Sequence, residues 1–162
     1  MYPHLQILSS VLMRLFALTI GCAAVAGCGA SPGPEEEVRL WIQQAETAVE
    51  NKDRGALMEM IAERYADARG NDKEDIGQKL RLWFLKSRNI VLASKIDNVT
   101  VLGDTAAQVL LTAGMAHTGD EAGDGILGLT ADAYRFELQL ENDGDAWRLI
   151  GARWGEVGSE LR

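Results

Sequence analysis

The chain has 162 residues, with 16 Lys and Arg against 24 Asp and Glu, and a formal net charge of −8 at pH 7. This acidic balance is unfavourable for holding phosphates, so we expect no nucleic-acid partner and no surface that binds lipid headgroups. The two cysteines, Cys22 and Cys28, both lie near the amino terminus. The remaining chain therefore has no disulfide and must be held together by its core.

The first 27 residues have the features of a secretory signal. An apolar run over residues 15–26 follows Arg14, which is the only Lys or Arg before Cys28. The run is too short for a membrane-spanning helix, which needs ~20 apolar residues. We therefore expect export with removal of the signal, rather than a transmembrane anchor. Met13 is an alternative start of the chain.

Val25-Ala26-Gly27-Cys28 ends the apolar run, and the chain changes character immediately after it. This tetrapeptide resembles the lipobox of bacterial lipoproteins. The resemblance implies cleavage between Gly27 and Cys28, and a Cys28 thiol that carries diacylglycerol and anchors the chain, since two acyl chains hold a protein stably on a membrane. Residues 28–34 then form a lipidated flexible tether. By resemblance to sorting in Gram-negative bacteria, Gly29 in place of Asp directs the protein to the outer membrane, facing the periplasm.

Residues 35–162 follow as one domain that is long enough to bury a sizeable core. Glu35-Glu36-Glu37 is expected to open a first helix, because acids are favoured at that end of the helix dipole. Apolar residues then recur at helical spacing up to Val49. Asp53 can cap a second helix, with an apolar face from Leu57 to Tyr65.

A third helix is expected after a break at residues 68–72. Asn71 and Glu74 resemble a capping box, and residues 76–84 supply an apolar face at helical spacing. The other face carries four basic residues, which we interpret as solvated: Lys79, Arg81, Lys86 and Arg88.

After residue 88 the apolar period changes from helical to two, which indicates strands. Residues 90–93 and 95–102 are strand-like, Gly103-Asp104 forms a tight turn, and a second strand continues through residues 107–111. Residues 116–130 are expected to be a loop. Residues 134–141 alternate as in a half-buried strand, and a turn leads to a last strand over residues 146–155.

Three helices followed by antiparallel strands, the last starting in Asp143-Gly144-Asp145-Ala146-Trp147-Arg148-Leu149-Ile150, resemble the nuclear transport factor 2-like (SnoaL-like) superfamily. The resemblance spans Glu35 to about Val157. It implies an α+β fold in which three amino-terminal helices pack on a curved antiparallel sheet, forming a cone with a pocket. The superfamily includes enzymes of the steroid isomerase, epoxide hydrolase, dehydratase and polyketide cyclase types, and also non-enzymatic binding and assembly domains. The fold alone therefore does not determine whether a member is an enzyme.

Five aromatic residues are candidates for lining the pocket of such a cone: Trp41, Tyr65, Trp83, Tyr134 and Trp154. Apolar pockets for small molecules usually have this composition. The alternative is that these side chains belong to an ordinary core.

Asp67 and Asp72, together with Tyr65, are candidates for acid–base chemistry at the mouth of the cone. The alternative is a solvated turn between helices, in which both aspartates act as caps and Arg69 forms an ion pair. Isomerase-like members of the superfamily use a carboxylate base with acidic hydrogen-bond donors. No residues here match that set, so no catalytic residue is assigned.

His117 lies close to an acidic segment that contains Asp120, Glu121 and Asp124. Zinc sites need three or four ligands at recognisable spacing, and the segment also lacks the ligand alternation of a calcium loop. We expect a hairpin loop, no metal and no cofactor.

The sequence therefore predicts a membrane-anchored lipoprotein of the cell envelope whose cone domain is a non-catalytic binding or assembly module. Superfamily members often dimerise through the outer face of the sheet, which makes a homodimer an expected partner. The candidate residues for that surface are Arg135, Glu137, Gln139 and Arg153. The alternatives are a carrier for a small apolar ligand and an isomerase-, dehydratase- or cyclase-type enzyme that uses a pocket carboxylate.

Overall fold

The computed structural model describes residues 32–119 and 129–162, and every element below belongs to the compact unit from Pro32 to Arg162. The predicted signal, the predicted cleavage site at Gly27 and Cys28, and most of the predicted tether lie outside these residues. So does the acidic segment with Asp120, Glu121 and Asp124. No helix in the described part of the chain is long and apolar enough to cross a membrane.

Three helices come first, as the sequence predicts: α2 (Pro34–Glu50), α3 (Arg54–Glu59) and α4 (Lys73–Lys86). Proline and three glutamates occupy the first turn of α2, where a missing N–H is tolerated and negative charge is favoured. The Asp53 side chain caps α3 by accepting the backbone N–H of Ala56 at 2.9 Å.

Two details of the helix prediction are wrong. α4 is capped by Asp72 and Asp75 in a capping box, one residue later than the predicted Asn71 and Glu74, because Asp72 takes the extended backbone conformation that the cap needs. α3 ends at Glu59, so Tyr65 does not lie on it.

Four antiparallel strands follow in sequence order: β1 (Ser87–Leu102), β2 (Ala106–Gly119), β3 (Leu129–Asn142) and β4 (Trp147–Glu156). The two predicted segments at 90–93 and 95–102 are one continuous strand, with a bulge between Ile96 and Asn98 that bends it without ending the pairing. The predicted loop at 116–130 is shorter, because β2 reaches residue 119 and β3 starts at residue 129.

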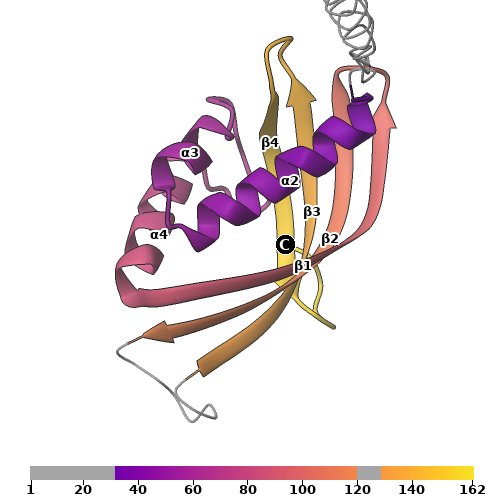
Figure 1. Cartoon of the computed structure of the whole chain (residues 1–162). Coiled ribbons are helices and arrows are strands. Elements are labelled where there is room, and N and C mark those ends of the chain that lie inside the picture. The colour runs from indigo at the N-terminus through magenta and orange to yellow at the C-terminus, as the bar shows by residue number, and fades with distance from the viewer. Residues whose placement is uncertain (1–31, 120–128) are drawn as a thin grey trace, which may run out of the picture. The chain divides into compact units, whose positions relative to one another are not determined.

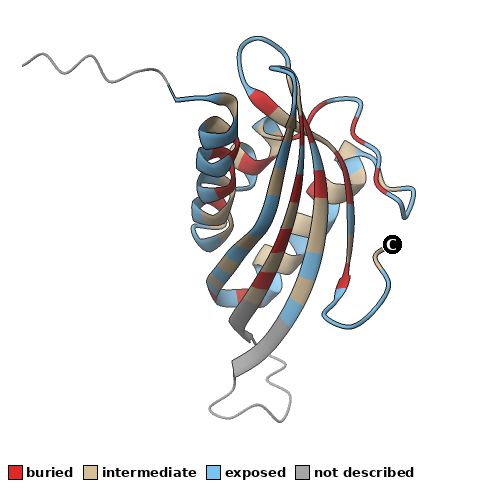
Figure 2. Ribbon diagram, turned by 90° about the vertical axis from the view of Figure 1, so that its right-hand side faces the viewer, coloured by how far each residue is buried: buried red, intermediate tan, exposed pale blue. Residues whose placement is uncertain are grey.

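The sheet curves around α2, which runs across its inner face, while α3 and α4 lie at one end of the sheet (Figure 1). Buried and exposed residues alternate along the strands, as the pleat of a sheet covered on one face requires (Figure 2). The most completely buried large side chains are Val38 on α2, Val109 on β2 and Leu140 on β3. The prediction of an α+β fold with three helices on a curved antiparallel sheet is confirmed.

The segment after α3 runs beside β4 and pairs with its free edge. The Leu149 N–H donates to the Met60 carbonyl at 2.9 Å, and the Ala62 N–H donates to the Leu149 carbonyl at 3.0 Å. Further along the segment, the Ala66 N–H donates to the Ile150 carbonyl and the Ala68 N–H donates to the Ala152 carbonyl. This pairing covers an edge that would otherwise expose unpaired backbone groups, and it holds residues 61–68 against the core.

Candidate functional site

An apolar cavity of about 300 Å³ lies between α2, α4 and the inner face of the sheet. One side of α2 lines it, because residues three, four and seven apart lie on the same side of a helix. The α2 residues at the cavity are Trp41, Ile42, Ala45, Glu46 and Val49. This cavity is the candidate site.

The opposite wall comes from alternate residues of the strands and from α4. Leu92 and Ser94 on β1, and Leu111 and Ala113 on β2, are two residues apart and so face the same side. Side chains from α3, the segment that follows it, α4, β3 and β4 complete the lining: Leu57, Met60, Ile61, Ile76, Leu80, Trp83, Phe136, Leu138 and Leu149. The cavity lining thus comes from seven separate elements, namely α2, α3, α4 and the four strands.

Glu46 is the one carboxylate among the described residues that line the cavity, and sequence reasoning did not select it. Its carboxylate accepts a hydrogen bond from the Ser94 hydroxyl, and both residues are half-buried. The sequence feature that could have identified Glu46 is its position on the apolar side of α2, four residues after Ile42 and three before Val49. A carboxylate held by a hydroxyl offers an oriented acceptor at the edge of an otherwise apolar space.

Trp41 presents a buried donor with no acceptor. The residue is 8% exposed, and its indole N–H has no hydrogen-bond partner among the described residues. Buried indole N–H groups usually find a partner. Trp41 and Met60 also line a second, larger groove, so these two side chains stand between the cavity and that groove.

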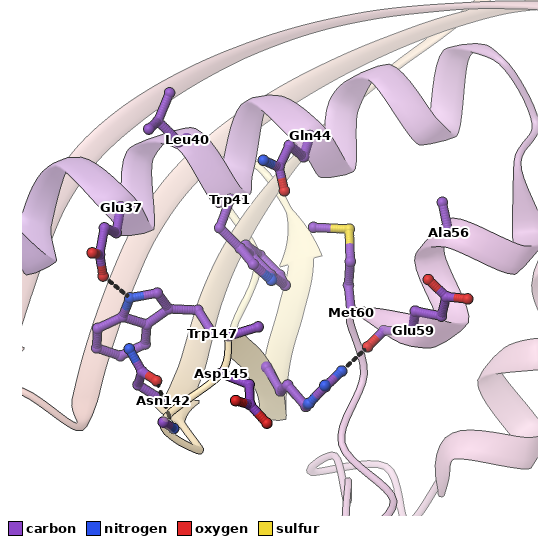
Figure 3. A pocket seen from close by; sticks show the side chains of 13 residues that line it. Glu37, Leu40, Trp41, Gln44, Ala56, Glu59, Met60, Asn142, Asp145 and Trp147 are labelled. Atoms are coloured by element: carbon purple, nitrogen blue, oxygen red, sulfur yellow. Dashed lines mark hydrogen bonds between the residues drawn. The ribbon is translucent and has the colours of Figure 1, made fainter. Parts of the chain in front are cut away.

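This groove, of about 710 Å³, lies between α2, α3 and the turn that joins β3 to β4 (Figure 3). The indole N–H of Trp147 donates to the Glu37 carboxylate at 3.0 Å and so joins the last strand to α2. Arg148 donates to the Asp143 carboxylate at 2.6 Å and to the Glu59 carbonyl. Two of the charged side chains of the groove, Glu37 and Arg148, therefore already link the elements around it.

Of the five predicted pocket residues, Trp41 and Trp83 line the cavity, and the other three do not. Tyr65 is 4% exposed and belongs to the core. The ring of Tyr134 packs beside that of Phe136, with centroids 6.3 Å apart. Trp154 packs against the core under the guanidinium of Arg69, which lies 4.4 Å from its ring centroid and donates to its carbonyl.

Asp67, a predicted acid–base residue, organises the turn that follows the extended segment. It is 9% exposed and accepts the backbone N–H groups of Arg69 and Asn71, both at 2.8 Å, and the Asn71 side-chain amide at 2.6 Å. Burial acts to raise the pKa of Asp67, but these hydrogen bonds and the nearby Lys79 outweigh it, so the pKa lies below its usual range. Burial, and then the charge of Asp67, raise the pKa of Tyr65.

The pKa values of Asp67 and Tyr65 are thus shifted away from neutral pH, whereas a proton-transfer pair works best with pKa values near the working pH. Asp72, the other predicted acid–base residue, caps α4 and is exposed. Neither aspartate lines the cavity. The side chains of residues 115–119 and 129–132, among them His117, are not described; among the side chains that are, no three of His, Cys, Asp or Glu are grouped so that they could hold a metal ion.

The residues predicted for a dimer surface lie on the outer face of the sheet. Arg153 on β4 forms an ion pair with Glu137 on β3, and Gln108 on β2 donates to the same glutamate at 2.8 Å. Arg135 and Gln139 flank Glu137 on that face and are exposed. The outer face of the described sheet thus carries polar side chains that contact one another across strands.

Known structures share this arrangement of helices and sheet. A ketosteroid isomerase-like protein from Erwinia carotovora atroseptica is 14% identical over 77% of this chain and 97% of its own, with a TM-score of 0.61. A nuclear transport factor 2-like superfamily protein from Salmonella enterica is 13% identical over 78% and 96%, with a TM-score of 0.62. A nuclear transport factor 2-like protein of unknown function in nutrient uptake from Rhodospirillum rubrum is 19% identical over 74% and 97%, with a TM-score of 0.57.

No protein-family model and no curated protein sequence matches the chain. At identities below 20%, similarity in three dimensions establishes the fold and not the activity. The order of elements, the curved sheet and these similar structures agree, and the chain has the nuclear transport factor 2-like fold.

Proposed function

We propose that the protein binds a small apolar molecule in its cone, without catalysis, while a lipid on Cys28 anchors it in the cell envelope. The observation that carries the binding proposal is the cavity of about 300 Å³ between α2, α4 and the sheet. This volume is at the lower end of the range for small-molecule sites, roughly 300–1,000 Å³. The ligand is therefore a compact hydrophobic molecule or one short hydrocarbon segment.

The polar groups around the cavity favour binding over acid–base catalysis. An isomerase-type enzyme needs a carboxylate that can reach the bound molecule and exchange a proton with it. Glu46 meets the requirement of position, but its carboxylate already accepts the Ser94 hydroxyl. Asp67 is held by three N–H donors in a turn outside the cavity lining.

A second candidate function is an enzyme that uses Glu46 as the pocket carboxylate. Its position in the cavity lining favours this reading. The two functions differ in their response to Glu46→Gln, which keeps the shape and the hydrogen bond to Ser94. A binding protein retains its ligand in this variant, whereas an enzyme retains the ligand but loses turnover.

The binding proposal can be tested by native mass spectrometry of the full chain purified from the membrane fraction. We expect a bound small molecule, and solvent extraction then identifies its chemical class. The Ala113→Leu variant, which places a larger side chain at the cavity, should be purified without the bound molecule. A ligand-free chain that also fails to bind a fluorescent apolar probe would contradict the proposal.

The anchoring part of the proposal is supported by the sequence Val25-Ala26-Gly27-Cys28 and by the following tether, which precedes the folded unit that begins at Pro32. Metabolic labelling with a fatty acid should mark the protein, and the mature chain should begin at Cys28. The Cys28→Ser variant should lose the label. An unprocessed, unlabelled wild-type chain would refute anchoring and leave the ligand-binding proposal intact.

A further inference from the structure

The carboxy-terminal half of α4 and the start of β1 form a basic stretch in an acidic protein. Residues 79–88 contain four Lys or Arg and no Asp or Glu, although the whole chain has a net charge of −8. Lys52 adds a further positive charge here, because its ammonium donates to the carbonyls of Ser87 and Arg88 at 2.8 and 2.9 Å. Positive charge is thus concentrated at one end of α4.

Two leucines on the same helix face outward. Leu82 is 61% exposed and Leu85 is 74% exposed. At about 100° per residue they lie about 60° apart on the helix, with Gln78 between them one turn earlier. Leu80 and Trp83, on the other side of the helix, line the cavity. α4 therefore presents apolar side chains both to the core and outward.

Basic residues lie on both sides of the outward leucines. Arg81 lies about 40° beyond Leu85, and Lys86 lies about 40° beyond Leu82 in the opposite direction. The acids of α4, Glu74 and Asp75, lie on the same side of the helix as the leucines but in its first turn, about two turns before Leu82. We call Arg81, Leu82, Leu85 and Lys86 the α4 outer face. An apolar centre with basic flanks is the pattern of a helix that lies in a membrane interface.

We propose that the α4 outer face docks on a membrane surface that contains anionic lipid. Such a surface offers phosphates to the basic flanks and the boundary of the acyl chains to Leu82 and Leu85. A nucleic acid would satisfy the cations only, and leave the leucines in water. The docking is separate from the proposed lipid on Cys28 and from the proposed ligand, since it uses neither.

The net charge does not prevent this docking. Charges separated by more than about 10 Å are largely screened at 0.1 M salt, so the local charge of the α4 outer face decides the interaction. From composition we expected no surface that binds lipid headgroups, but that expectation assumes that the negative charge is spread evenly over the protein. The acidic remainder of the domain instead selects the orientation, because it is repelled by the same lipids.

The test places an environment-sensitive nitrobenzoxadiazole dye on the full chain, at Gln78→Cys, with Cys22→Ser and Cys28→Ser so that one thiol reacts. The control carries the dye at Asp104→Cys, in the turn at the other end of the 16-residue strand β1. On vesicles of phosphatidylglycerol and phosphatidylcholine, we expect the emission at position 78 to shift to the blue. Pure phosphatidylcholine vesicles and the dye at position 104 should show no shift.

Two pairs of substitutions separate the contributions of charge and of apolar contact. Arg81→Gln with Lys86→Gln should weaken docking about 25-fold, since each basic residue near an anionic surface contributes roughly fivefold. Leu82→Ser with Leu85→Ser should abolish the shift, while circular dichroism confirms that both double variants are folded. Absence of a shift at position 78, equal shifts at both positions or on both lipids, or crosslinking of position 78 to a protein in intact cells would each overturn the proposal.

Discussion

Replacing Ala113 with leucine tests whether the cone contains real space. Ala113 is 4% exposed on β2 and lines the cavity, so three added carbons enter volume that is already empty. At ~0.8 kcal/mol per buried carbon the gain is about 2.4 kcal/mol, and the lost rotamer freedom of leucine subtracts about 0.5–1 kcal/mol. We expect Ala113→Leu to stabilise the protein by about 1.5 kcal/mol. For a unit of about 130 residues, this raises Tm by about 5 °C.

The matched control is Ala107→Leu. Ala107 lies on the same strand and the same inner face and is also 4% exposed, but it packs in the core and does not line the cavity. Overpacking there should cost about 1–3 kcal/mol. Urea unfolding followed by tryptophan fluorescence measures both changes on ligand-free protein. If both variants lose stability to a similar extent, the cone is filled and the reasoning for a binding site fails.

Three further predictions concern the contacts around the site. Asp67→Ala should cost about 1–3 kcal/mol of unfolding free energy above pH 4. Because folding lowers the pKa of Asp67, its contribution is complete above its unfolded pKa near 4 and is lost as pH falls through its folded pKa. In urea unfolding, the free energies of the wild type and the variant should therefore converge towards pH 2, and a constant difference would contradict the lowered pKa. Asp72→Ala should cost about 1 kcal/mol of unfolding free energy through loss of the α4 cap, whereas Asp72→Asn should cost much less. Trp147→Phe removes the donor to Glu37 and should cost about 1 kcal/mol by the same assay, and an unchanged stability would show that this bond does not hold the last strand to α2.

The stability and ligand measurements answer different questions about the cavity. Ala113→Leu can stabilise the fold only if the space is empty in the unliganded protein. If the wild-type chain is purified with a molecule in the cone, that molecule adds its own stabilisation and reduces the apparent advantage of the variant. The sign of the change in ligand-free protein therefore reports the cavity, and the change on adding ligand reports its occupant.

Periodicity along the chain determined most of the secondary structure. Apolar residues three and four apart predict α2 and α4, alternation from residue 134 to 141 predicts β3, and turn residues mark the hairpin before β4. These signals are local, because a helix or strand buries the side that its own sequence makes apolar. The errors are local as well: Asn71 and Asp72 are both good caps, and only the backbone conformation at Asp72 decides between them.

The site depends on contacts between residues that are distant in sequence. Glu46 meets Ser94 across 48 positions, and Asp67 is buried because the segment before it pairs with the edge of β4. Nothing in the spacing around either residue reports those partners. The aromatic residues show the same division. Helical spacing places Trp41 and Trp83 on inward faces, but only the packing of seven elements leaves a cavity beside them, while Tyr65 packs in the core and does not line that cavity. Sequence alone thus determined which faces are apolar, whereas the tertiary structure decided where those faces leave a cavity, because a cavity is the difference between the volume enclosed by the backbone and the volume of the side chains that fill it.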